Sequence, residues 1–269
     1  MKKTFDLDSI LSTSRYNLHS HTQFCDGRGT MDQFARAAAD AGILHYGFTP
    51  HSPVPFDTPC NMKADDVPAY LAEVERIRKK YDTVQFYAGM EIDYLGPEWG
   101  PAHPYFAGLD LDYSIGSVHF LPAKSDPSRF IDVDGRPERF VQYMHEYFDD
   151  DIEYVVEEFY RRSSAMVRAG GFDILGHLDK IGANASYYLP GIERRRRYLD
   201  ALNALVDDVI ASGVCVEINT KSLAQTGRLF PRETVVARLY RAHVPLLVNS
   251  DTHYPDLINA GRPYALSLL

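Results

Sequence analysis

Short apolar runs recur along the chain, and each one leads into a polar residue, a loop or a helix. The runs have no polar face at alternate positions, which is typical of parallel strands buried on both sides of a sheet. The first run begins at Asn17 and leads into His19 and His21. We predict the other strands at 45–50, 84–94, 111–118, 171–176, 214–219 and 244–249.

Amphipathic segments separate these strands. Thr30 and Gln33 have the spacing of a capping box, which predicts a helix that starts there and ends at Gly42. Further helices are predicted at 66–81, at 136–169 with a break at 149–151, at 192–211 and at 232–241. Strand, polar group and helix alternate seven times, which favours an α/β barrel.

The length and composition agree with a single large domain. The chain has 269 residues, of which 45% are hydrophobic and 24% are charged, and α/β barrels of this size are common. We find no internal repeat, low-complexity segment or linker, so one domain over 1–269 is predicted.

The net charge of −9 argues against non-specific binding to nucleic acid, which needs a basic surface. An anionic substrate stays open, because bound metal ions can reverse the local charge. The three cysteines are far apart and form no C-x-x-C pair, which indicates free thiols in a reducing compartment. Without a recognisable signal peptide or transmembrane run, the expected location is cytoplasmic, with no membrane partner. The oligomeric state stays open.

Histidines and carboxylates gather where the predicted strands end. His19 and His21 are two residues apart on a strand, so their side chains point to the same side. The first loop and the ends of the other strands provide further polar side chains of this kind, with one asparagine among them: Asp26, His51, Glu91, His119, His177, Asn219, Asp251 and His253. In isolation each would be an ordinary polar residue, but burying so many without partners would be costly. The pattern therefore predicts a site for several metal ions at the C-terminal rim of the barrel. His45 opens its strand, so we expect it at the opposite rim.

These segments resemble the motif series of the PHP (polymerase and histidinol phosphatase) superfamily. The matching segments are His-Ser-His-Thr-Gln-Phe-Cys-Asp-Gly from position 19, Thr-Pro-His-Ser, Gly-Met-Glu-Ile-Asp-Tyr, Gly-Ser-Val-His, Gly-His-Leu-Asp-Lys and Asn-Ser-Asp-Thr-His. Within the superfamily, the chain is most similar to the histidinol-phosphate phosphatases. The resemblance implies a distorted (β/α)7 TIM-like barrel that holds three divalent metal ions, with Zn, Mn and Fe as the candidates.

The resemblance also implies a ligand set for each ion. His19, His21, Glu91 and Asp251 would hold the first metal, and Glu91 would bridge to a second metal held by His119 and His177. Asp26, His51 and His253 would hold the third. Asp93 shares a face with Glu91 and is a candidate for supporting a ligand. The implied chemistry is attack on phosphorus, in line with the leaving group, by a metal-bridging hydroxide held by Glu91 and Asp251.

The resemblance implies a small phosphate monoester as the substrate, L-histidinol phosphate, which would be hydrolysed to L-histidinol and phosphate in histidine biosynthesis. Arg228 is the first candidate for binding the phosphate, ahead of Lys180 and Lys221, and a solvated surface charge is the alternative for each. Residues expected near the cationic part of the substrate are Phe56, Asp57, Asp93, Tyr94, Glu98 and Trp99. A phosphotyrosine or nucleotide phosphatase of the same fold, or a non-catalytic metal-binding protein, are the alternative functions.

Overall fold

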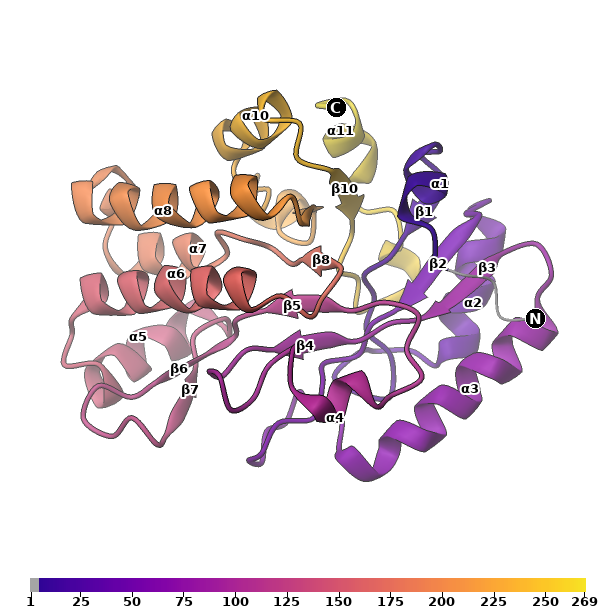
Figure 1. Cartoon of the computed structure of the whole chain (residues 1–269), viewed down its shortest axis with the longest axis horizontal. Coiled ribbons are helices and arrows are strands. Elements are labelled where there is room, and N and C mark those ends of the chain that lie inside the picture. Colours follow the sequence, from indigo (N-terminus) through magenta and orange to yellow (C-terminus); the bar gives the residue numbers. More distant parts are fainter. Residues whose placement is uncertain (1–4) are drawn as a thin grey trace.

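The computed structural model describes residues 5–269, which form a mixed α/β fold around parallel strands (Figure 1). The strands are β1 (Tyr16–Asn17), β2 (His45–Phe48), β3 (Gln85–Ala88), β4 (Glu91–Asp93), β5 (Ile115–Ser117), β6 (Phe120–Pro122), β7 (Phe130–Asp132), β8 (Ile174–Leu175), β9 (Cys215–Asn219) and β10 (Leu246–Asn249). The α-helices are α1 (Leu7–Leu11), α2 (Met31–Asp40), α3 (Val67–Lys80), α4 (Pro104–Ala107), α5 (Pro137–Tyr147), α6 (Ile152–Ala169), α7 (Ile181–Tyr188), α8 (Arg196–Ser212), α9 (Leu223–Thr226), α10 (Glu233–Arg241) and α11 (Arg262–Leu266). Short 3-10 turns are η1 (Ala64–Asp66), η2 (Ile192–Arg194) and η3 (Pro255–Leu257).

Two parallel sheets make up the barrel. One has the order β1-β2-β3 and the other the order β10-β9-β8-β5-β4. Isolated parallel bridges join them, from Ser20 to Thr252 on one side and from His51 to Glu91 on the other. β3 and β4 are successive parts of one interrupted strand, so seven strand positions follow one another around a distorted barrel, as the sequence predicted. Both bridges lie among the histidines and carboxylates of the predicted site.

Helices cover the outer face of the barrel. The long helices α6 and α8 lie side by side on one flank, and α2 and α3 cover the strands β2 and β3 (Figure 1). The apolar stripe of α6 belongs to the largest hydrophobic cluster of the described residues, and that of α3 belongs to a second cluster. Because both faces of the parallel strands are buried, their sequences lack a polar alternate face.

The interior of the barrel is filled by aromatic and aliphatic side chains at its N-terminal end. Tyr113 crosses this interior and donates a hydrogen bond to the carbonyl of Leu18 over 2.5 Å. A Cβ atom at Gly47 would lie 1.8 Å from the Tyr113 hydroxyl, so only glycine fits at that position of β2. Ile10 of α1 is fully buried against the same interior cluster, so α1 packs at this end of the barrel.

Most predicted helices are confirmed. The Thr30–Gln33 capping box begins α2, and the break predicted at 149–151 separates α5 from α6. Asp149 and Asp150 adopt left-handed backbone angles there, and the Asp151 carboxylate caps α6 by accepting a hydrogen bond from the Tyr154 amide. The antiparallel hairpin β6–β7, directly after β5, was not predicted.

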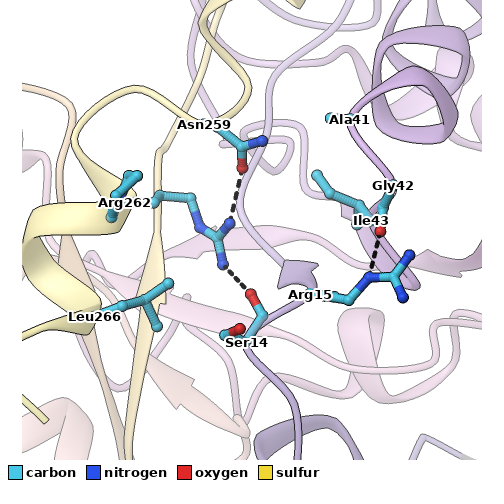
Figure 2. A pocket seen from close by; sticks show the side chains of 9 residues that line it. Ser14, Arg15, Ala41, Gly42, Ile43, Asn259, Arg262 and Leu266 are labelled. Carbon is cyan, nitrogen blue, oxygen red and sulfur yellow. Dashed lines mark hydrogen bonds between the residues drawn. The ribbon is translucent and has the colours of Figure 1, made fainter.

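A pocket of about 230 Å³ lies at the N-terminal ends of β1 and β2 (Figure 2). Its two arginines already serve backbone carbonyls: Arg15 donates to Gly42 and Arg262 to Ser14. These two arginines therefore stabilise the local backbone. Because the pocket lies at the N-terminal ends of the strands, it is remote from the C-terminal ends that carry the predicted site. None of the helices within residues 5–269 combines the length and the apolar character that a membrane span requires.

Candidate metal centre

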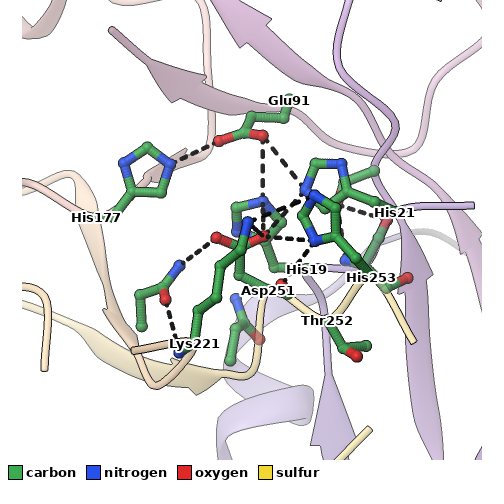
Figure 3. Close-up of polar contacts among 12 residues, drawn as sticks. His19, His21, Glu91, His177, Lys221, Asp251, Thr252 and His253 are labelled. Atoms are coloured by element: carbon green, nitrogen blue, oxygen red, sulfur yellow. Dashed lines mark hydrogen bonds and ion pairs between the residues drawn. The ribbon is translucent and has the colours of Figure 1, made fainter. Parts of the chain in front are cut away.

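The nine predicted metal ligands converge at the C-terminal ends of the strands, although they come from six different parts of the chain. Figure 3 shows His19, His21, Glu91, His177, Asp251 and His253 pointing toward one another. Four overlapping sets of possible donor atoms contain all of the nine except Asp251, whose Oδ1 lies 3.1 Å from His21 Nε2. The nine residues fall into three groups. Six of the nine residues are buried, namely His19, His21, Glu91, His119, His177 and Asp251.

The first group consists of His19, His21, Glu91 and Asp251. Ser20 turns away and donates to the Gly47 carbonyl, which leaves both histidines on the same side, as the sequence predicted. The Nε2 atoms of His19 and His21 lie 3.3 and 3.5 Å from Glu91 Oε2, and 3.7 and 3.1 Å from Asp251 Oδ1. Ligand atoms about 2.0–2.2 Å from a tetrahedral metal are roughly 3.3–3.6 Å apart. The spacing is therefore that of atoms arranged around a single ion.

The second group lies on the other side of Glu91. Glu91 Oε1 is 2.8 Å from His177 Nε2 and 3.3 Å from His119 Nε2, and these two nitrogens are 3.2 Å apart. The two oxygens of Glu91 thus face different groups of histidines. Glu91 is therefore placed where it could serve two metal ions, one on each oxygen.

The third group combines Asp26, His51 and His253. Asp26 Oδ1 is 3.2 Å from His253 Nε2 and 3.8 Å from His51 Nε2. The tight loop that returns Asp26 to the barrel depends on Gly27, where a Cβ atom would lie 2.3 Å from the backbone of His21. The structure therefore brings Asp26 to the other two residues.

Unpartnered polar atoms mark the centre of the cluster. His19 Nε2, His21 Nε2, Asp26 Oδ1 and Glu91 Oε2 are all buried and make no hydrogen bond. Buried polar atoms are normally satisfied, and leaving each of them without a partner costs about 1–3 kcal/mol. Three of these atoms come from the segment that follows β1 and the fourth comes from β4, and all of them are nitrogen or carboxylate oxygen, the donor set that Zn²⁺ and related ions bind. The residues present therefore fit a metal centre.

Glu217 of β9 supports the site, and the sequence analysis missed it. Its carboxylate is fully buried and has four contacts: Oε1 with His19 Nδ1 at 2.6 Å and Asn249 Nδ2 at 3.0 Å, and Oε2 with the amide of His177 at 3.1 Å and Asn219 Nδ2 at 3.0 Å. The signal was present, because an acidic residue inside the apolar run 214–219 must have buried partners.

These contacts determine the tautomer of His19. The side-chain oxygens of Asn219 and Asn249 accept hydrogen bonds from the backbone amides of Lys221 and Leu18, so both Nδ2 groups must face Glu217 as donors. Glu217 is ionised and can only accept, so His19 Nδ1 carries the proton. In the neutral form of His19, which a metal ligand requires, the lone pair then lies on Nε2, the atom that faces Glu91 and Asp251.

Asp93 contacts the Nδ1 atom of His119, as Glu217 does for His19. Asp93 Oδ1 lies 2.7 Å from His119 Nδ1, while its Oδ2 accepts from the side chain of Asn61 over 2.9 Å. This contact agrees with the supporting role predicted for Asp93, because it leaves His119 Nε2 facing Glu91 and His177.

The electrostatics keep the carboxylates ionised. Burial alone would raise the pKa of Glu91, but His19, His119 and His51 hold it well below its ordinary value. Burial is likewise outweighed at Asp251, where Lys221, His19 and Lys180 keep the pKa of the carboxyl well below its ordinary value. Both groups are therefore anionic at neutral pH and available to a cation.

The structure changes the order of the candidate phosphate-binding residues. Arg228 is engaged elsewhere: its guanidinium lies 2.5 Å from Glu193 and 3.9 Å from Asp179. Lys221 instead reaches Asp251 Oδ1 at 3.3 Å and lies 3.4 Å from His253 Nε2 (Figure 3). Lys180 is 3.8 Å from Asp251 Oδ2 and is also paired with Asp134 at 2.6 Å. Both lysines, which the sequence ranked after Arg228, lie next to the cluster.

Several residues expected near the substrate have other roles. Asp93 is bonded to His119, and Tyr94 is buried in the largest hydrophobic cluster. The indole of Trp99 packs against His103 and donates to the Pro53 carbonyl. Asp57 and Glu98 are exposed, while Phe56 is half-buried and contacts the β6–β7 hairpin.

A parallel α/β barrel with histidines and carboxylates clustered at its C-terminal rim defines the class of protein. The PHP domain model matches residues 17–221, and the chain belongs to this family, which confirms the family predicted from the motifs. Asp251 and His253 lie beyond the matched segment, so it is the fold that brings them to the cluster.

Three known proteins are similar over most of their length. A relative from Deinococcus radiodurans named "Probable histidinol-phosphatase" is 28% identical over 88% of this chain and 85% of its own. A crystal structure from Listeria monocytogenes, given a provisional histidinol phosphatase assignment, has a TM-score of 0.80 at 19% identity and covers 93% of this chain and 99% of its own. A histidinol phosphate phosphatase from Lactococcus lactis, solved with zinc, L-histidinol and phosphate, has a TM-score of 0.69 at 17% identity and covers 95% and 92%. At these identities the two structures establish the fold alone.

Proposed function

We propose that the protein is a metal-dependent phosphatase that hydrolyses L-histidinol phosphate to L-histidinol and phosphate. The observation that carries the proposal is the set of four unpartnered buried donor atoms, spaced as ligands are spaced around metal ions. The names of the similar proteins support the choice of substrate. The proposal treats 1–269 as one catalytic domain, with cytoplasmic histidine biosynthesis as its setting.

The proposed ligand sets follow the three groups of donor atoms. His19, His21, Glu91 and Asp251 would hold one ion, and Glu91 would also serve a second ion on His119 and His177. Asp26, His51 and His253 would hold a third. Imidazole and carboxylate together suit Zn, Mn or Fe. Bound divalent ions would supply Lewis acidity, which polarises the phosphoryl oxygens and lowers the pKa of water.

The protein's own residues supply positioning and charge. Glu91 and Asp251 would lie beside the attacking water, and the leaving alkoxide would depart in line on the opposite side of phosphorus. Lys180 and Lys221 neutralise the non-bridging phosphoryl oxygens, since their ammonium groups already lie beside Asp251. Glu217 and Asp93 keep His19 and His119 in the tautomers that present Nε2 to the centre.

Phosphate release from L-histidinol phosphate tests the proposal. The protein is stripped with a chelator and then reloaded separately with Zn, Mn, Fe or Mg, while its metal content is measured by elemental analysis. We expect activity to disappear on chelation, to return with a transition metal, and to accompany up to three ions per chain. Full activity with one metal ion or none would contradict the proposed centre.

A further inference from the structure

The β6–β7 hairpin extends the metal-binding rim on one side. It begins directly after His119, and the amide of Val133 returns to donate to the His119 carbonyl over 2.9 Å. Asp132 lies opposite Phe120 in the hairpin register. The next carboxylate, Asp134, lies 2.6 Å from the ammonium of Lys180, which itself approaches Asp251. The end of β7 is thereby fixed beside the candidate metal centre.

Only one of the two carboxylate oxygens of Asp132 has a partner among the described residues. Its Oδ1 accepts hydrogen bonds from the amides of Asp134 and Gly135, over 2.8 and 3.0 Å, which fixes the side chain in a turn. No hydrogen bond or ion pair within residues 5–269 involves its Oδ2. Burial and the neighbouring charge of Asp134 raise the pKa of Asp132, so a cation beside it would relieve an unfavourable charge.

An aromatic wall adjoins this carboxylate. Phe56, from the loop after His51, stacks on Phe130 with ring centroids 5.8 Å apart and meets the edge of Phe120 at 5.3 Å. Cys60 of the same loop feels the charges of both Asp26 and Asp132, which together with burial raise the pKa of its thiol to about 11. The loop and the hairpin therefore face each other beside the third group of donor atoms.

The site consequently has two electrically different sides. Lys180 and Lys221 lie beside Asp251, where the phosphate of a monoester would be held, and Asp132 lies with the aromatic rings on the hairpin side. We propose that Asp132 binds the ammonium group of the substrate and that Phe56 packs against its imidazole ring. This assignment rests on the proposed function and makes Asp132 the residue that selects amine-bearing phosphate monoesters.

The amine is the better partner for the carboxylate. An aliphatic ammonium is charged throughout the neutral range, whereas an imidazole with a pKa of about 6.5 is mostly uncharged there. A flat aromatic ring is in turn the natural partner of Phe56, whose side chain is half-buried on the rim.

The variant Asp132→Asn isolates the free oxygen. Asparagine keeps an Oδ1 acceptor for the two turn amides and removes only the charge at Oδ2. Asp126→Asn is the matched control, because Asp126 is exposed in the same hairpin and its Oδ1 accepts from the Ser128 amide in a similar turn. Substrates are L-histidinol phosphate, L-phenylalaninol phosphate, which keeps the amine, and 3-(imidazol-4-yl)propyl phosphate, which lacks it.

We expect Asp132→Asn to lower kcat/KM about 10- to 100-fold for both amine-bearing substrates, mainly through KM, and less than about threefold for the substrate without an amine. Asp126→Asn should change none of the three by more than about threefold. Equal losses on all substrates, or no loss on any, with an active wild-type enzyme would overturn the role of Asp132 alone. A wild-type enzyme inactive on L-histidinol phosphate would overturn the proposed function and this assignment with it.

Discussion

Replacing Glu217 with glutamine tests how the buried shell controls the metal ligands. Both carboxylate oxygens of Glu217 accept two hydrogen bonds, and all four partners are donors. A glutamine side chain must turn its NH₂ group toward one of these pairs. The asparagine partners cannot rotate to compensate, because their own oxygens are held by the backbone amides of Leu18 and Lys221.

The magnitude follows from the number of donors left unsatisfied. Two buried donors would lose their acceptor, at about 1–3 kcal/mol each, so Glu217→Gln should cost about 2–6 kcal/mol of folding free energy in the metal-free protein. If the NH₂ group faces His19, the imidazole is driven toward the tautomer that places its proton on Nε2. Loss of a group that orients a metal ligand typically weakens metal binding about 10- to 100-fold.

Metal affinity is measured by competition with a chromophoric chelator, and stability by urea unfolding of the metal-free protein. The control is Asp112→Asn. The Asp112 side chain is 4% exposed, and it accepts from the Ala88 amide and from Arg78 before the start of β5, away from the metal-binding rim. It should lose stability while keeping its metal affinity. Metal affinity of folded Glu217→Gln within about threefold of wild type would refute the reasoning.

Other changes separate catalytic from structural roles. Glu91→Ala should lower kcat/KM at least about a hundredfold, because it exposes neighbouring metal ions to each other's charge. His45→Ala, at the opposite rim, should keep kcat/KM near the wild-type value. Equal losses in steady-state assays would mean that the catalytic rim is wrongly assigned. Lys221→Ala should lower kcat/KM about tenfold. Arg228→Ala should lower the melting temperature but change kcat/KM less than about threefold. A larger loss of kcat/KM in Arg228→Ala than in Lys221→Ala would restore Arg228 as the phosphate ligand. Despite burial, Arg228 and its neighbour Arg232 lower the pKa of Glu193, so ionised Glu193 stabilises the fold above its ordinary pKa and this contribution is lost as pH falls. The difference in unfolding free energy between wild type and Glu193→Gln, measured by urea titration, should therefore shrink from about pH 6 to pH 3. A constant difference would exclude the ion pair as its source.

The convergence of histidines and carboxylates at one rim of the barrel could be predicted because it depends on patterns within short segments of the sequence. A histidine or carboxylate at the end of an apolar run is visible in one segment, and parallel strands bring such ends to the same side of the barrel. His19, His21 and Glu91 could be placed in this way. The two bridges between the sheets then pair Ser20 with Thr252 and His51 with Glu91, which explains why residues so far apart in the chain meet.

The remaining contacts depend on distances that periodicity does not contain. Arg228 was ranked first for phosphate because of its charge and loop position, but whether it reaches the site depends on Glu193, 35 residues away, which binds it instead. The hairpin that carries Asp132 was not predicted, because its strands are only three residues long and rich in polar neighbours. Tyr94 and Trp99 were expected near the substrate from their residue types and their place after the strand that carries Glu91, but Tyr94 lies in the hydrophobic core and Trp99 packs against a second cluster.

The central claim is that this centre hydrolyses L-histidinol phosphate in preference to other monoesters. The most direct test is kcat/KM of the metal-loaded protein for L-histidinol phosphate, phosphotyrosine and nucleoside monophosphates, measured side by side. We predict that L-histidinol phosphate leads by at least about a hundredfold, which corresponds to about 2.7 kcal/mol of differential transition-state binding. Equal values across the panel, or a lead for phosphotyrosine, would contradict the claim.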